Sequence, residues 1–134
     1  MLSKRTKGFL FCIFIYLLAL VISIYVGSFL VGIHQWMIVL TGHIVATMVI
    51  FIFSHLTKNS SLYDAFWSVG PIPIALYLAF WPTSNVINIE KIFIIISPLL
   101  FWAFRLTHNW SRHWSGMEME DWRYVDLKNK FKKK

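Results

Sequence analysis

The sequence predicts an all-α, polytopic membrane protein with four transmembrane helices and with both termini on the cytoplasmic side. Two observations support the fold class: hydrophobic residues make up 57% of the 134 residues, and charged residues make up only 14%. Soluble domains carry about 25% charged residues, so a water-soluble globular fold is excluded. The apolar residues also gather in four runs, each close to the roughly 20 residues that cross a bilayer. We therefore expect one membrane domain that is embedded in the lipid bilayer.

The first two apolar runs predict an antiparallel pair of helices. Residues 8–31 follow three basic residues, as in a signal peptide, but the run is longer than a usual signal sequence and has no small-residue cleavage site. We therefore expect a retained transmembrane helix at 8–31. A second helix is expected at 36–56, because the connection between the two runs has room only for a tight turn.

The third helix is expected at 62–81, and its first turn has two interpretations. Ser61 and Asp64 have the spacing of a capping box, in which Asp64 would satisfy a free N–H at the helix start. Alternatively, Asp64 lies at the same membrane depth as Arg105 and Arg112 and orients one of them, because an unpaired carboxylate at the membrane edge is costly. The two interpretations are compatible.

The middle of the third run carries a helix-breaking sequence. Gly70-Pro71-Ile72-Pro73 removes two backbone donors, so the helix must kink or break there. Broken helices are tolerated inside a membrane only against protein or a cavity. This stretch is therefore a candidate wall of a ligand pocket, and a packing kink is the alternative.

The fourth helix is expected at 90–114, followed by a polar cytoplasmic tail at 115–134. With four helices, 12 of the 13 Lys and Arg residues lie on the side of the termini, and only Lys91 lies on the other. Positively charged segments stay in the cytoplasm, which supports this orientation. The sequence does not indicate which membrane holds the protein.

The end of the fourth run combines cationic and aromatic residues. Arg105, His108, Asn109 and Arg112 share one helical face, which is cationic and rich in hydrogen-bond donors. Together with Arg123, these arginines could hold a diphosphate. The alternative is an ordinary membrane interface, with arginines on the cytoplasmic side and tryptophans among the headgroups.

Two motifs carry a resemblance to a known family. One is Arg105-Leu-Thr-x-x-Trp-x-Arg112 followed by Glu120-Asp-Trp-Arg-Tyr124, and the other is the earlier Ser61-Leu-Tyr-Asp64-Ala-Phe-Trp67. In this order they resemble a membrane-protein family of unknown function that is grouped with the steroid 5-alpha reductases. The resemblance covers most of this chain, but only about the N-terminal half of a typical member.

The resemblance implies an NADPH-dependent reductase of conjugated carbon-carbon double bonds in lipid-like or steroid-like molecules, incomplete without further helices. It implies catalytic roles for Asp64 and Tyr63. The second helix lacks a Glu that the reductases would use as an acid, so only Asp64 and the phenols of Tyr63 and Tyr77 remain as candidates. The implied cofactor-binding residues are Arg105, Asn109, Arg112, Arg123 and Tyr124. The implied substrate pocket contains Trp67, Gly70 and Pro71.

Two other functions are compatible with the sequence. One is a non-catalytic four-helix membrane protein or a subunit that packs against a partner membrane chain. The other is a relative of the isoprenylcysteine and phospholipid methyltransferases, which bind S-adenosylmethionine at a similar helix end. We expect no metal site, because the chain has a single cysteine, Cys12, and scattered histidines. The lysine-rich end at 128–134 predicts contact with anionic headgroups rather than with nucleic acid.

Overall fold

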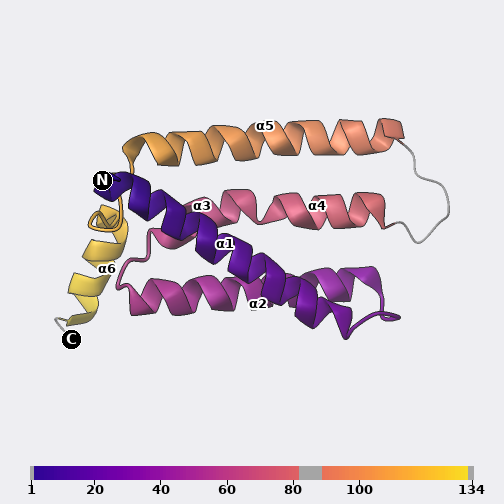
Figure 1. Ribbon diagram of the computed structural model, residues 1–134, viewed down its shortest axis with the longest axis horizontal. Coiled ribbons are helices and arrows are strands. Elements are labelled where there is room, and N and C mark those ends of the chain that lie inside the picture. The colour runs from indigo at the N-terminus through magenta and orange to yellow at the C-terminus, as the bar shows by residue number, and fades with distance from the viewer. Residues whose placement is uncertain (1, 82–88, 133–134) are drawn as a thin grey trace.

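The computed structural model of this chain describes residues 2–81 and 89–132, and all of its regular elements there are helices (Figure 1). The connection expected between the third and fourth helices, at 82–89, lies outside the described residues except for its last position. The helices are α1 (Lys4–Ser28), α2 (Gln35–Leu56), α3 (Leu62–Val69), α4 (Pro71–Phe80), α5 (Ile89–His113) and α6 (Trp122–Lys132). The predicted all-α class is therefore confirmed for this part of the chain.

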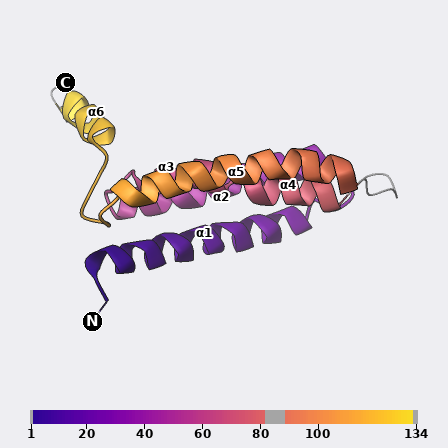
Figure 2. The ribbon, with the colours of Figure 1, turned by 90° about the horizontal axis from the view of Figure 1, so that it is seen from above.

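The long helices form two layers. Helix α2, the α3–α4 rod and α5 lie side by side in one layer, and α1 crosses that layer diagonally (Figure 1). The turned view separates α1 from the other long helices and shows α6 projecting from one end (Figure 2). The start of α1, the α2–α3 turn, the end of α5 and α6 all lie at this end, which we call the polar end.

The core lies where α1 crosses α2 and α3. Ile15 of α1, Ile50 of α2 and Leu62 of α3 are fully buried there. The Tyr16 hydroxyl donates a hydrogen bond to the carbonyl oxygen of Leu62 at 2.6 Å, which ties α1 to the start of α3. Most other large apolar side chains on the long helices are exposed, as expected for surfaces that face lipid rather than water.

Three of the described helical segments are long and apolar enough to cross a membrane: Lys4–Ser28, Gln35–Leu56 and Ile92–His113. The protein is therefore a membrane protein by helix length and composition. The region expected as one helix at 62–81 instead contains α3 and α4, of 8 and 10 residues, lying end to end. Their junction falls at Gly70 and Pro71, because proline cannot donate the next helical hydrogen bond. The predicted break is confirmed, whereas four membrane crossings remain a prediction.

The tail expected to be merely polar contains helix α6. Asp121 caps its start, because the Asp121 carboxylate accepts a hydrogen bond from the N–H of Arg123 at 2.9 Å. Helix α5 ends at His113, and Gly116 follows in the left-handed region with φ of 122°. The chain therefore turns sharply between α5 and α6, and this turn brings α6 across the polar end.

Candidate functional site

The α2–α3 turn holds the segment between α5 and α6 through Asn59. The Asn59 side chain is 2% exposed, and its amide donates to the carbonyl oxygens of Met117 at 2.8 Å and Met119 at 3.0 Å. Its side-chain oxygen accepts from the N–H of Ser61 at 3.0 Å. Because a buried amide must satisfy its hydrogen bonds, these three bonds fix the position of the segment between α5 and α6.

Two more hydrogen bonds extend this attachment. The backbone N–H of Ser60 donates to Glu120 Oε1 at 2.8 Å, and the N–H of Asp121 donates to Ser61 Oγ at 2.8 Å. The expected capping box is therefore wrong, since the Ser61 side chain makes no cap hydrogen bond to α3 and instead binds Asp121. We call the contact between residues 59–64 and 117–128 the polar junction.

Asp64 also belongs to the polar junction. The Tyr124 hydroxyl donates to Asp64 Oδ1 at 2.8 Å, and Arg123 Nη2 lies 3.7 Å from the same oxygen. The Asp64 side chain is only 13% exposed. Asp64 thus joins two residues of the later motif, whereas the expected partners were Arg105 and Arg112.

The register and rotation of α5 explain this difference. Ser68 Oγ and Thr107 Oγ1 are 2.9 Å apart, so counting back along these antiparallel helices puts Arg112 near the level of Asp64. Arg105 is two residues from Thr107, which is about 200° around a helix, so it lies on the face of α5 opposite α3. Arg105 and Arg112 are exposed and make no hydrogen bond or ion pair with any residue that the structure describes.

The predicted cofactor residues therefore form two separate groups. Arg105, Asn109 and Arg112 are exposed on α5, on the side away from α3. Arg123 and Tyr124 lie on α6 beside Asp64. Nothing in the described residues brings the two groups together.

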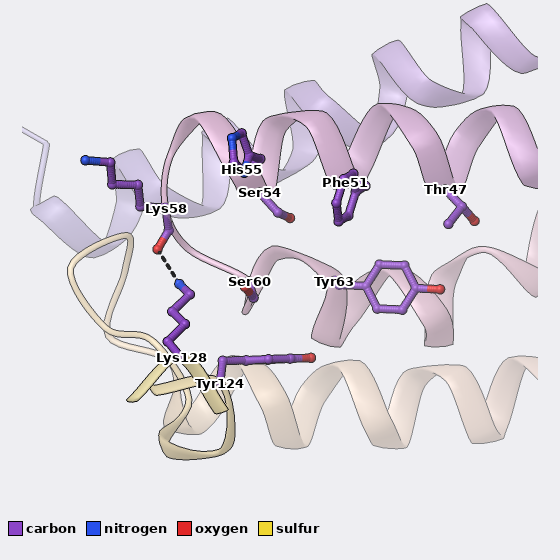
Figure 3. Close-up of a pocket in the computed structure, with 9 residues that line it drawn as sticks. All are labelled: Thr47, Phe51, Ser54, His55, Lys58, Ser60, Tyr63, Tyr124 and Lys128. Carbon is purple, nitrogen blue, oxygen red and sulfur yellow. Dashed lines mark hydrogen bonds between the residues drawn. The ribbon is translucent and has the colours of Figure 1, made fainter. Parts of the chain in front are cut away.

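A cavity of about 740 Å³ lies between α2, α3 and α6, close to the polar junction (Figure 3). It is lined by Thr47, Phe51, Ser54, His55, Lys58, Ser60, Tyr63, Tyr124 and Lys128. The phenols of Tyr63 and Tyr124 extend in the same direction along it, whereas the Lys58 ammonium points away from both (Figure 3). The sequence prediction included Tyr63 and Tyr124 but not the α2 residues, although their spacing along α2 would have put them on one face.

The residues predicted to form the substrate pocket are not among those that line this cavity. Trp67 packs edge-on against Trp102, with ring centroids 5.7 Å apart. Gly70 and Pro71 lie at the α3–α4 junction, where the N–H of Gly70 donates to the carbonyl oxygen of Phe66 at 2.7 Å. The end of α3 and the start of α4 account for Gly70 and Pro71 without a ligand.

Burial, hydrogen bonds and charges alter the pKa values of several groups at the polar junction. Burial raises the pKa of the Asp64 carboxyl above its ordinary value, although the hydrogen bond from Tyr124 and the charge of Arg123 oppose this effect. Burial and the hydrogen bond to Asp64 raise the pKa of Tyr124 to about 12. Partial burial alone would raise the pKa of Glu120, but hydrogen bonds from Lys128 and Ser60 outweigh it and hold that pKa below its ordinary value. The Arg123 guanidinium lowers the pKa of Asp121 by hydrogen bonding. At neutral pH the junction is therefore a set of paired charges.

Helix α1 supports the same region from the other side. Gly8 lies so close to the segment after α5 that an added Cβ would be 3.1 Å from the Trp114 ring and 3.2 Å from Gly116 Cα. Arg5 Nη2 donates to the carbonyl oxygen of Ser111 at 2.6 Å, near the end of α5. The segment between α5 and α6 is thus held between α1 and the α2–α3 turn. Among the described residues, no group of His, Cys, Asp or Glu is arranged to hold a metal ion.

Comparison with protein families gives one match. A family model described as a protein of unknown function, DUF1295, matches residues 50–134. The match starts within α2 and includes the polar junction, both motifs and α6. Comparisons with curated proteins and with solved structures found no match.

Proposed function

From the premise that this chain belongs to the DUF1295 family of proteins of unknown function, we propose that it binds an oxygen-bearing, lipid-like ligand in its cavity. We further propose that it is the substrate-binding part of a steroid 5-alpha reductase-like membrane protein. The family match and the apolar helices fit a membrane protein, and the matched residues include the polar junction and α6. The sequence motifs suggest the reductase relationship.

The observation that carries the proposal is the position of Tyr63. Its ring lines a cavity of about 740 Å³, which is within the usual range for small-molecule sites, roughly 300–1,000 Å³. No hydrogen bond to the Tyr63 hydroxyl is present among the described residues, so this O–H can donate to a ligand oxygen. In the reduction of an enone, such a donor stabilises negative charge that develops on the carbonyl oxygen.

Asp64 is a positioning residue in this proposal. Its carboxylate accepts the hydrogen bond from Tyr124, so the Tyr124 proton points to Asp64 and the Tyr124 oxygen can accept from a ligand hydroxyl. The two phenols therefore offer different hydrogen bonds. Tyr63 recognises an acceptor such as a ketone, and Tyr124 is held in place at the cavity by α3.

The described residues do not fit a whole NADPH molecule. Arg123 is already bound to Asp121 and lies near Asp64, and Lys128 is bound to Glu120. The unpaired Arg105 and Arg112 are exposed on the side of α5 away from α3. A complete reductase would therefore need further protein groups to hold and cover the dinucleotide, as the family resemblance implies.

Membrane orientation follows from the same arrangement. The basic start of α1, Lys58 and the basic residues of α6 lie at the polar end, and segments rich in Lys and Arg stay in the cytoplasm. We propose that the polar end is cytoplasmic and that the α3–α4 rod provides the remaining crossing. The cavity would then open near the cytoplasmic headgroups.

Ligand binding by purified protein in detergent micelles tests the proposal. Equilibrium dialysis should detect binding of a radiolabelled steroid enone, and Tyr63→Phe should weaken that binding roughly two- to tenfold, as expected for one neutral hydrogen bond. Tyr77→Phe is the matched control, because Tyr77 does not line the cavity. Failure of the wild-type protein to bind any enone would refute the proposal, and binding of S-adenosylmethionine instead would favour the methyltransferase-like alternative.

A further inference from the structure

The exposed side of α5 carries a cationic face inside a candidate membrane crossing. Arg105 and Arg112 lie within Ile92–His113, the crossing segment of α5. Arg105 is eight residues from the end of that segment, which corresponds to about 12 Å of helix. Both arginines and Asn109 between them are exposed.

No described carboxylate is available to neutralise this face. The chain has six acidic residues, and five of them pair with Lys or Arg residues at the polar end. The sixth, Glu90, lies at the opposite end of α5. Since an unpaired guanidinium at membrane depth is costly, an anion from outside the described residues would stabilise Arg105 there.

The residues that precede Arg105 on the same side of α5 indicate what kind of molecule carries the anion. Ile94 and Phe101 precede Arg105 by 11 and 4 residues, and these spacings put all three on one stripe of α5. Ile94 is 69% exposed and Phe101 is 72% exposed. The stripe is therefore apolar toward the membrane interior and cationic toward the polar end, which is the polarity of a membrane lipid.

We propose that this face of α5 binds the phosphate group of an anionic membrane lipid. Arg105 and Arg112 are seven residues apart, about 10.5 Å along the helix, so a phosphate at the level of Asn109 is within reach of both long side chains. Guanidinium groups form paired hydrogen bonds to phosphate oxygens. The lipid tails lie along Phe101 and Ile94. This proposal does not depend on the function proposed for the cavity.

The same guanidiniums could instead meet the phosphates of a soluble nucleotide. The depth of Arg105 favours a lipid, because this residue lies about 12 Å inside the crossing segment, where a water-soluble nucleotide would have to leave water. NADPH is therefore the competitor that separates the two sources of phosphate.

The experiment measures retention of phosphatidylglycerol by the purified full chain in detergent, by native mass spectrometry. The wild-type protein should prefer phosphatidylglycerol to phosphatidylcholine, and excess NADPH should not displace it. Changing Arg105→Gln and Arg112→Gln together should weaken retention by about tenfold or more, as expected for the loss of two charge-assisted contacts.

Lys7→Gln with Lys130→Gln is the matched control, because it removes the same charge from the polar end but not from this face. Circular dichroism checks that both double variants keep their helices. Equal losses in the two double variants would overturn the proposal in favour of diffuse attraction. Equal binding of both lipids would also overturn it, and displacement by NADPH would assign the face to a nucleotide.

Discussion

The Tyr124 hydroxyl donates a hydrogen bond to Asp64 Oδ1 at 2.8 Å across a separation of 60 residues. This bond joins α6 to the first turn of α3 and connects the two sequence motifs directly. Arg123 Nη2 lies 3.7 Å from the same carboxylate oxygen. The polar junction and one wall of the cavity therefore depend on the same pair.

Tyr124→Phe should lower the free energy of unfolding by roughly 1.5–3 kcal/mol, because it removes a hydrogen bond to a charged group. Denaturant titration in micelles measures the change, with Tyr77→Phe as the control for loss of a phenol. In a double-mutant cycle with Asp64→Asn, the two substitutions should not be additive. Additive effects would show that the pair does not stabilise the protein.

Acid should weaken the contacts that Glu120 and Asp121 make at the polar junction, whereas Asp64, whose pKa is raised, contributes in the opposite sense. Glu120 and Asp121 have lowered pKa values in the folded protein, and their ordinary values are 4.5 and 3.8. The unfolded chain therefore takes up protons first as the pH falls. The stabilisation is fully present above these ordinary values and is lost as the pH drops through the lowered ones. The free energy of unfolding, measured from pH 6 downward through these pKa values, should show this loss. Glu120→Gln should make the free energy of unfolding depend less on pH. An identical pH dependence in the variant would contradict this prediction.

Two glycines within helices should respond to alanine in opposite ways. Each substitution gains up to about 1 kcal/mol of helix propensity. At Gly42 the nearest atom is 3.8 Å from an added Cβ, so Gly42→Ala should be neutral or stabilising. At Gly8 three atoms lie within 3.1–3.3 Å, two of them in the backbone, so overpacking should cost about 1–3 kcal/mol. Thermal unfolding measures both, and a stabilising Gly8→Ala would show that α1 does not press on the segment after α5.

Cysteine labelling should test the orientation. In a Cys12→Ala background, Ile33→Cys lies in the α1–α2 connection and should react with a membrane-impermeant reagent added to intact cells. Lys130→Cys on α6 should react only after the membrane is opened, because positively charged segments stay in the cytoplasm. The reverse pattern would invert the topology, and labelling of both from outside would rule out a cytoplasmic polar end.

The sequence prediction succeeded where local composition decides the structure. The long apolar runs predicted helices because a chain in lipid must satisfy its hydrogen bonds internally. The proline at position 71 predicted the break between α3 and α4 because it lacks an N–H. Helix α6 was missed, since its sequence is polar and its cap, Asp121, was read only as part of a motif.

The partner of Asp64 could not be predicted in the same way. Membrane depth did suggest an arginine near its level, and the register of Ser68 with Thr107 puts Arg112 there. Depth says nothing about rotation around a helix axis, however, and α5 presents Thr107 rather than its arginines to α3. Arg123 reaches Asp64 because the left-handed turn at Gly116 redirects the chain.

By itself, then, the sequence determined the helical class, the positions of the long helices, the break at Pro71 and the family relationship. Each of these depends on residues that are close together in the chain. Only the tertiary structure decided that the two motifs meet, that Tyr63 and Tyr124 line one cavity, and that Arg105 faces outward. These features join residues about 60 positions apart, or depend on how α5 is rotated against α3, and local periodicity contains neither kind of information.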